Sequence, residues 1–160
     1  MKKLLSVILT VVLLFTAFSI FTVLAENEVV VSREIIYNPD GSYTEIVVTE
    51  KINNIMPCAE TYTKSGTKNG HRYDENGKLK YTFTVHGTFT VRAGVSATCT
   101  NASYSTSNIA SGWSLDSAST GKSANKAIGN ATFKYKVLLI TSKTEDISVT
   151  LSCDGNGNLS

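Results

Sequence analysis

Apolar and polar residues alternate along several stretches of this chain, with the period of two that is typical of β-strands. The longest stretch covers residues 81–91. Its apolar positions are Tyr81, Phe83, Val85, Phe89 and Val91, and its polar positions are Thr82, Thr84, His86, Thr88 and Thr90. The pattern predicts a long strand with one buried and one solvated face, in which Gly87 marks a bulge or bend.

The same alternation predicts further strands on both sides of this one. It recurs over residues 95–100, 113–115, 132–137 and 147–153. Nearer the N-terminus, residues 28–37 and 42–50 flank the sequence Asn38-Pro39-Asp40-Gly41, whose proline and glycine favour a tight turn and therefore a β-hairpin. Residues 74–77 form a second turn of this kind. No window shows the spacing of an amphipathic helix.

Strands joined by polar turns predict an all-β protein. We expect an antiparallel, immunoglobulin-like β-sandwich of seven or eight strands over residues 61–160. We expect a β-hairpin over 26–52 to precede it, and a linker over 53–60, where Pro57 interrupts the alternation. The Ser- and Thr-rich stretch 101–126 could be disordered, but its scattered aromatic and aliphatic residues favour thin strands and loops.

The first 25 residues have the pattern of a secretory signal peptide. Lys2 and Lys3 precede an uncharged stretch, and Val23-Leu24-Ala25 supplies the small residues that signal peptidase requires. We therefore expect cleavage after Ala25 and a secreted, extracellular protein. The alternative is an uncleaved membrane anchor, since the uncharged stretch could span a bilayer, but no basic stop-transfer cluster follows it.

Composition excludes several classes of protein. The chain has 160 residues, of which 42% are hydrophobic and 18% charged, so it is neither intrinsically disordered nor a multi-span membrane protein. The 15 basic residues include Lys2 and Lys3, so removal of the signal peptide leaves 13 basic and 13 acidic residues. We therefore expect no nucleic-acid partner, and no membrane partner after signal cleavage.

Several short segments resemble those of a family of small secreted all-β proteins from Gram-positive bacteria. They are Lys64-Ser65-Gly66, the run 81–90, Ser96-Ala-Thr-Cys-Thr, Gly121-Lys-Ser, Val149-Thr-Leu-Ser-Cys and Gly157-Asn-Leu-Ser. The resemblance covers residues 61–160 and the hairpin turn ahead of them. It implies export and an all-β fold. The family has no established activity, so no functional residue is transferred from it.

Two of the three cysteines lie on the apolar faces of predicted strands. Cys99 follows Val95 and Ala97, and Cys153 follows a longer apolar series, so both should point into the core. An exported protein meets conditions in which a disulfide persists, and we predict a Cys99–Cys153 bond. The alternative is two inert buried thiols. Cys58 lies in the linker and is expected to be a free thiol.

No sequence motif predicts a catalytic residue, a cofactor or a metal ion. His71 and His86 are interpreted as surface residues, because no nucleophile motif accompanies them. Asp154-Gly155-Asn156-Gly157-Asn158 imitates the start of a calcium loop but lacks its closing glutamate, so we expect a polar turn. The carboxylate pairs Asp74-Glu75 and Glu145-Asp146 are both predicted to lie in solvated turns.

The leading functional hypothesis is a secreted, non-catalytic β-sandwich that binds a protein or glycan at a cell surface. Exposed aromatic side chains commonly carry such recognition. The candidates are Tyr62, Tyr73, Tyr104 and Trp113, which could alternatively be core residues. Two other hypotheses are a small secreted effector or bacteriocin-like toxin, and a hydrolase of unknown substrate. Fold alone favours none of the three.

Overall fold

The structure is a computed structural model that describes residues 28–52, 60–138 and 140–160. The predicted signal peptide over 1–25, its cleavage site, Cys58 and nearly all of the expected linker lie outside these residues. The described residues form strands and turns, with no helix among them. The all-β prediction is therefore confirmed, and no described helix could cross a membrane.

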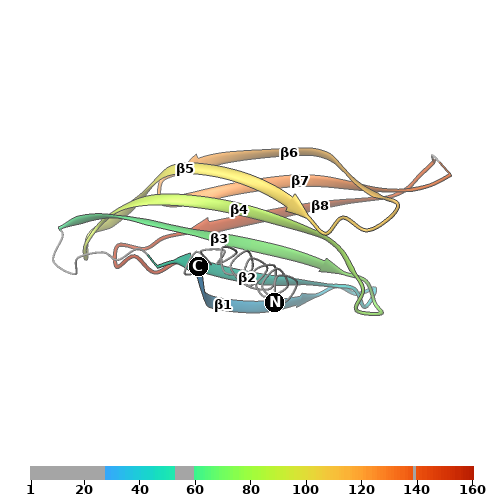
Figure 1. The fold of residues 1–160 in the computed structure, drawn as a ribbon, viewed down its shortest axis with the longest axis horizontal. Helices are drawn as coiled ribbons and strands as arrows, with labels where there is room; N and C mark the ends of the chain where they lie inside the picture. The colour runs from blue at the N-terminus through green and yellow to red at the C-terminus, as the bar shows by residue number, and fades with distance from the viewer. Residues whose placement is uncertain (1–27, 53–59, 139) are drawn as a thin grey trace, which may run out of the picture.

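Eight antiparallel strands form two sheets (Figure 1). The first sheet contains β1 (Glu28–Tyr37), β2 (Tyr43–Lys51), β3 (Thr61–Tyr73), β4 (Leu79–Arg92) and β5 (Ser96–Ser107). The second contains β6 (Trp113–Ser123), β7 (Lys126–Val137) and β8 (Ile140–Ser152). In both sheets every strand pairs with the next one in the sequence, so each sheet is a meander.

This strand order refines the predicted topology. The immunoglobulin-like arrangement is not confirmed, because neither sheet has the crossover connection of a Greek key. Residues 61–160 form six strands, since 101–126 contributes the end of β5, all of β6 and the first residue of β7 instead of several short strands. The N-terminal hairpin β1–β2 supplies the other two and belongs to the same sheet, because β2 pairs with β3 from Tyr43↔Tyr73 to Glu50↔Gly66.

The core lies between the two sheets, and β4 runs through its centre. The apolar residues of β4 at alternate positions are all buried, as the sequence pattern predicts. Tyr81 stacks on Phe133 of the opposite sheet, with ring centroids 3.8 Å apart and planes 8° from parallel. The pairing of β4 with β5 shifts by one residue between Thr88 and Phe89, beside the glycine that predicted a bulge.

Glycines allow the two sheets to approach closely. A Cβ atom on Gly70 of β3 would lie 2.8 Å from Ile147 Cδ1 of β8, and one on Gly87 of β4 would lie 2.9 Å from Leu151 Cδ2. Gly66 faces Leu159 in the same way, and Gly129 of β7 faces Val85 of β4. At these positions an aliphatic side chain of one sheet occupies the space that a side chain on the other would need.

Both described cysteines are buried in the core, as their parity predicts. The predicted disulfide is wrong for this structure, in which Cys99 and Cys153 are free thiols. The Cys99 thiol donates to the carbonyl oxygen of Asn101 at 3.3 Å, and the Cys153 thiol lies 3.6 Å from the carbonyl oxygen of Asp154. Strand parity fixes the side on which a cysteine lies, but it does not bring two cysteines within bonding distance.

We predict that Gly129→Val destabilises the protein by about 2–3 kcal/mol, because the new side chain would overlap Val85 and Phe83. Chemical denaturation measures the change. Gly121→Val in the neighbouring strand β6 is the matched control, since nothing lies near a Cβ atom there and it should be close to neutral. Equal effects of the two substitutions would contradict the close approach of the sheets.

We also predict that the two core thiols are inert in the folded protein. Burial raises the pKa of Cys99, and burial together with the nearby Asp154 carboxylate raises the pKa of Cys153 to about 11, so neither is a thiolate at pH 8. In a Cys58→Ser variant, a thiol reagent should label neither cysteine until denaturant is added, and then both. If neither cysteine is labelled even in denaturant, the result would support the Cys99–Cys153 disulfide instead.

Candidate functional site

Four connections meet at one end of the sandwich, since alternate turns of a meander return to the same side (Figure 1). They are the turn 38–42, the turn 74–78, the loop 108–112 and the β7–β8 hairpin. We call this the Trp113 end, after the tryptophan that begins β6. The loop 108–112 is fixed to both sheets, because Ala110 N–H donates to the carbonyl oxygen of Lys80 and Lys136 N–H donates to that of Gly112, both at 2.8 Å.

Aspartates shape two of these connections. The carboxylate of Asp40 accepts hydrogen bonds from the hydroxyl and the backbone N–H of Ser42, and these bonds lower the pKa of Asp40. The carboxylate of Asp74 accepts from Lys80 Nζ at 2.5 Å and from the backbone N–H of Lys78 at 2.8 Å, which lowers the pKa of Asp74. Both carboxylates are therefore charged at neutral pH.

A buried ion pair joins the two sheets at this end. Arg72 of β3 donates from Nε and Nη2 to the two carboxylate oxygens of Glu145 of β8, at 3.0 and 3.1 Å. The hydroxyl of Tyr81 donates to the same carboxylate at 2.9 Å, and Lys143 Nζ lies 2.6 Å from it. The Arg72 and Glu145 side chains are only 12% and 11% exposed, so the pair is largely removed from water.

The ion pair holds its members in fixed charge states. Burial alone would raise the pKa of Glu145, but hydrogen bonds from Arg72, Lys143 and Tyr81 outweigh it and lower the pKa. Burial, and then the Glu145 charge, strongly raise the pKa of Tyr81, which stays a neutral donor. In these charge states the Glu145 carboxylate accepts hydrogen bonds, and Arg72 and Tyr81 donate them.

Beside the ion pair lies a hollow of about 350 Å³ with an aromatic lining. Trp113 and Tyr135 pack against each other with ring centroids 5.5 Å apart and together provide this aromatic lining, and the Trp113 ring centroid lies 5.3 Å from that of Tyr81. Ala110 and Ser111 of the loop 108–112 are the other uncharged residues that line the hollow. The charged lining residues are Asp74, Glu75, Lys78, Lys80 and Lys143. The hollow thus combines aromatic surface with hydrogen-bonding groups of both charges.

The structure brings two of the four predicted aromatic residues together. Trp113 and Tyr73 both line a smaller hollow of about 30 Å³. The ring of Tyr73 also stacks on that of Tyr43, with centroids 4.7 Å apart. Tyr104 lies elsewhere on β5, 5.8 Å from Phe83. Tyr62 is at the opposite end, where its hydroxyl donates to the carbonyl oxygen of Asn156 at 3.1 Å. Only Trp113 and Tyr73 therefore belong to the candidate site.

The sequence interpretation missed Arg72, Tyr135 and Lys143, and it misplaced Glu145. The predicted solvated turn at Glu145-Asp146 is wrong, because both residues lie within β8. Glu145 faces the other sheet, whereas Asp146 faces outward and accepts from the Thr132 hydroxyl at 2.7 Å. Glu145 lies on the same face of β8 as the apolar residues Ile147, Val149 and Leu151, because side chains two positions apart in a strand point to the same side. This alternation could have identified Glu145 as a carboxylate that faces the core.

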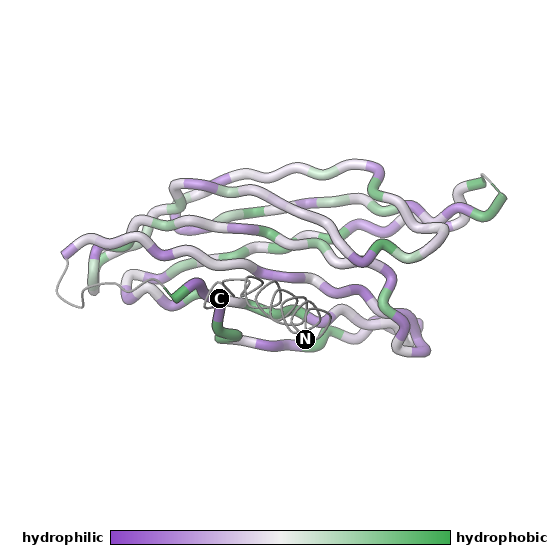
Figure 2. The backbone as a smooth tube through the Cα atoms, in the orientation of Figure 1, coloured by the Kyte–Doolittle hydropathy of each residue, from purple (hydrophilic) through white to green (hydrophobic). Residues whose placement is uncertain are grey.

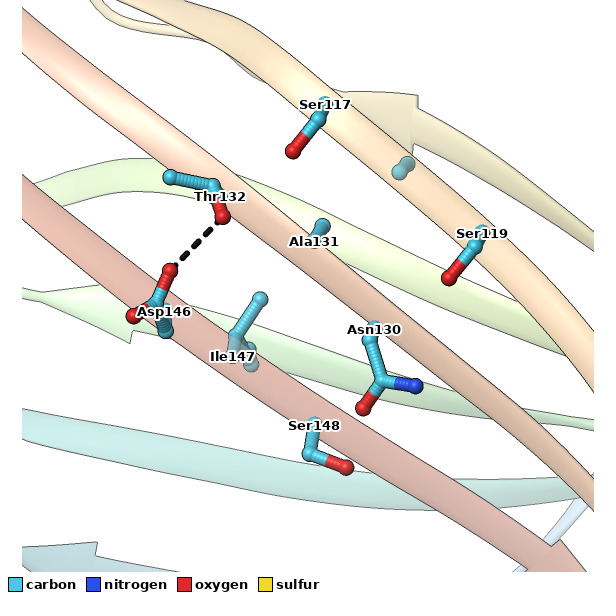
Figure 3. Close-up of a pocket in the computed structure, with 9 residues that line it drawn as sticks. Ser117, Ser119, Asn130, Ala131, Thr132, Asp146, Ile147 and Ser148 are labelled. Atoms are coloured by element: carbon cyan, nitrogen blue, oxygen red, sulfur yellow. Dashed lines mark hydrogen bonds between the residues drawn. The ribbon is translucent and has the colours of Figure 1, made fainter.

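A second, wider hollow lies on the outer face of the three-stranded sheet (Figure 3). It has a volume of about 500 Å³, and short polar side chains cover its floor. These are Ser117, Ser119, Asn130, Thr132, Asp146 and Ser148, which Figure 3 shows pointing away from the core. Because no aromatic side chain lines this hollow, we take the Trp113 end as the candidate site.

The remaining candidate groups have structural partners. Both oxygens of the Asp154 carboxylate are engaged by Asn156 and Asn158, each bond being 2.8 Å long, as expected of a polar turn. His71 and His86 each lie 2.9 Å from a hydroxyl, of Thr82 and Ser105 respectively. Within the described ranges, no group of three or more His, Cys, Asp or Glu side chains could hold a metal ion.

Comparisons with protein-family models, with curated proteins and with solved structures found no match for this chain. The resemblance to small secreted proteins of Gram-positive bacteria therefore stays a hypothesis, and the site must be interpreted from its own geometry.

We predict that Glu145→Gln lowers the free energy of unfolding by about 3 kcal/mol, because Arg72 would keep a buried charge without its counter-charge. Glu75→Gln at the exposed turn is the isosteric control and should change stability by less than about 0.5 kcal/mol. Denaturant titration at neutral pH measures both.

The same pair gives a pH dependence with a defined sign. The pKa of Glu145 in the folded protein lies below its ordinary value of 4.5, so its contribution is complete at neutral pH and is lost as the pH falls below that value. Stability of the natural protein should therefore fall more steeply in acid than that of Glu145→Gln. Parallel stability curves for the two proteins would show that Glu145 is not held ionised by Arg72.

Proposed function

We propose that this protein is a secreted, non-catalytic binding protein whose Trp113 end recognises a glycan on a cell surface. The observation that carries the proposal is the hollow lined by Trp113 and Tyr135, which has an aromatic wall and a charged rim. Its volume of about 350 Å³ lies within the range of small-ligand sites. Export, predicted from residues 1–25, would place this end outside the cell.

The chemistry of the hollow favours a sugar among the ligand classes. The C–H faces of a sugar ring pack on aromatic side chains, and its hydroxyls both donate and accept hydrogen bonds. Trp113 and Tyr135 provide the aromatic surface, while lysines and carboxylates provide donors and acceptors around it. Recognition by connections gathered at one end is also how immunoglobulin-like sandwiches bind, and in this proposal the present sandwich works in the same way.

The charge states at the Trp113 end favour binding over catalysis. A hydrolase of the carboxylate type needs one protonated carboxyl group near neutral pH. Hydrogen bonds instead lower the pKa of Asp40, Asp74 and Glu145, which keeps all three charged. These groups are suited to orienting a ligand.

Trp113 is the only tryptophan of the chain, so its fluorescence reports directly on the hollow. We expect soluble peptidoglycan fragments or N-acetylglucosamine oligomers to change the emission of Trp113 in a saturable manner. Ser111→Arg would fill the hollow from its exposed rim and should abolish the change. Ser123→Arg, at the exposed opposite end of β6, is the matched control and should bind normally. A response that Ser111→Arg leaves intact, or no response to any glycan tested, would contradict the proposal.

A further inference from the structure

The β7–β8 hairpin exposes a concentrated apolar tip. Val137 and Ile140 form its last paired positions and are 48% and 72% exposed, while Leu138 between them is 91% exposed. Figure 1 shows this hairpin extending beyond the rest of the Trp113 end, and Figure 2 shows its tip as a hydrophobic segment. A protruding tip of large aliphatic side chains is unfavourable in water and calls for a partner.

The backbone at the tip is also unsuited to its residues. Leu138 has a φ of 48°, in the left-handed region that favours glycine and asparagine. A two-residue hairpin connection normally contains such residues, and the structure describes a leucine there. Asparagine or glycine at position 138 would relieve the backbone strain and reduce the exposed apolar surface together. The sequence at this turn therefore serves neither turn formation nor solubility, which points to a function.

Basic and aromatic side chains lie directly behind the tip. Residues 134–143 contain Lys134, Lys136 and Lys143 and no acidic residue. Lys134 pairs with Asp116, and Lys143 with Glu145, whereas Lys136 is exposed and pairs with no acidic side chain among the described residues. Tyr135 lies between the first two lysines. This order, with aliphatic residues outermost and aromatic and basic residues behind them, matches the change in polarity across a lipid–water interface.

We propose that the apolar tip, Val137, Leu138 and Ile140, inserts into the interface of a lipid bilayer that carries anionic headgroups, and that Lys136 contacts those headgroups. From the Lys136↔Thr141 pair to the turn the hairpin advances by about two residues, or about 7 Å. Interfacial segments are buried about 5–10 Å deep, so the tip can reach the acyl boundary while Lys136 stays at headgroup level. Such shallow insertion leaves the polar backbone groups of the turn within reach of water.

A lipid surface fits this tip better than a protein groove. The exposed apolar residues lie on a narrow hairpin that extends beyond the sheet, so a deformable partner can surround them. The overall charge balance argued against a membrane partner, but that balance averages over the whole chain and conceals the acid-free segment 134–143. Tyr135 and Lys143 line the glycan hollow as well, but the inserting residues Val137, Leu138 and Ile140 and the headgroup contact Lys136 are not among its lining residues.

The test is flotation of the protein with vesicles of equimolar phosphatidylglycerol and phosphatidylcholine. We expect the natural protein to float with these vesicles and to bind pure phosphatidylcholine vesicles more weakly. Leu138→Asn should reduce binding at least tenfold while raising the thermal unfolding temperature, because asparagine suits the left-handed turn. Lost binding in a more stable protein cannot be attributed to misfolding. Ile140→Thr, which keeps a β-branched residue, should also weaken binding.

Val95→Ser is the matched control, because Val95 is an exposed aliphatic residue in the β4–β5 turn at the opposite end. It should leave vesicle binding unchanged. Failure of the natural protein to float, or equal flotation of Leu138→Asn, would overturn the proposal. So would a dimer in size-exclusion chromatography that Leu138→Asn converts to a monomer, with no vesicle binding by either protein. Because Leu138→Asn leaves the hollow intact, glycan-dependent Trp113 fluorescence in this variant separates the two proposals.

Discussion

The sandwich depends on a close fit between glycines of one sheet and aliphatic side chains of the other. Gly70 of β3 and Gly87 of β4 leave space for Ile147 and Leu151 of β8, and Gly66 of β3 leaves space for Leu159 in the C-terminal segment that follows β8. Gly129 of β7 leaves the corresponding space for Val85 in the reverse direction. Without these positions the facing strands would have to separate, and the aromatic stacking of Tyr81 on Phe133 would be lost with them.

The candidate site continues this same contact toward solvent. Gly70 of β3 faces Ile147 of β8. Toward the Trp113 end, Arg72 lies two residues after Gly70 in β3, and its partner Glu145 lies two residues before Ile147 in β8. Close packing therefore gives way to an ion pair where the sandwich opens, and the hollow beside Trp113 begins there. The charged pair Arg72 and Glu145 is positioned by the packing of the core, and residues of the connecting turns such as Lys78 complete the rim.

The alternation of apolar and polar residues predicted the strands and turns, which depend on residues close together in the sequence. It could not predict contacts between residues that are far apart in the sequence. The strand 81–91, its buried face and the turns at 38–41 and 74–77 follow from side-chain periodicity and turn chemistry. The contact of Arg72 with Glu145 joins residues far apart in the chain and could not be read from either segment. The cysteines illustrate the boundary, because parity predicted that both would be buried and could not determine their separation. Of the four predicted aromatic candidates, Trp113 and Tyr73 share a hollow for the same unpredictable reason.

A single covalent connection, the loop 108–112, passes between the two meanders within residues 60–138 and 140–160. The hollow at Trp113 lies at that passage, with Asp74 and Lys80 contributed by one sheet and Trp113 and Tyr135 by the other. A molecule seated there would contact both halves of the protein and would bind poorly once the sheets separate. Occupancy and folding are therefore thermodynamically linked, and each gain in ligand affinity becomes a gain in resistance to unfolding.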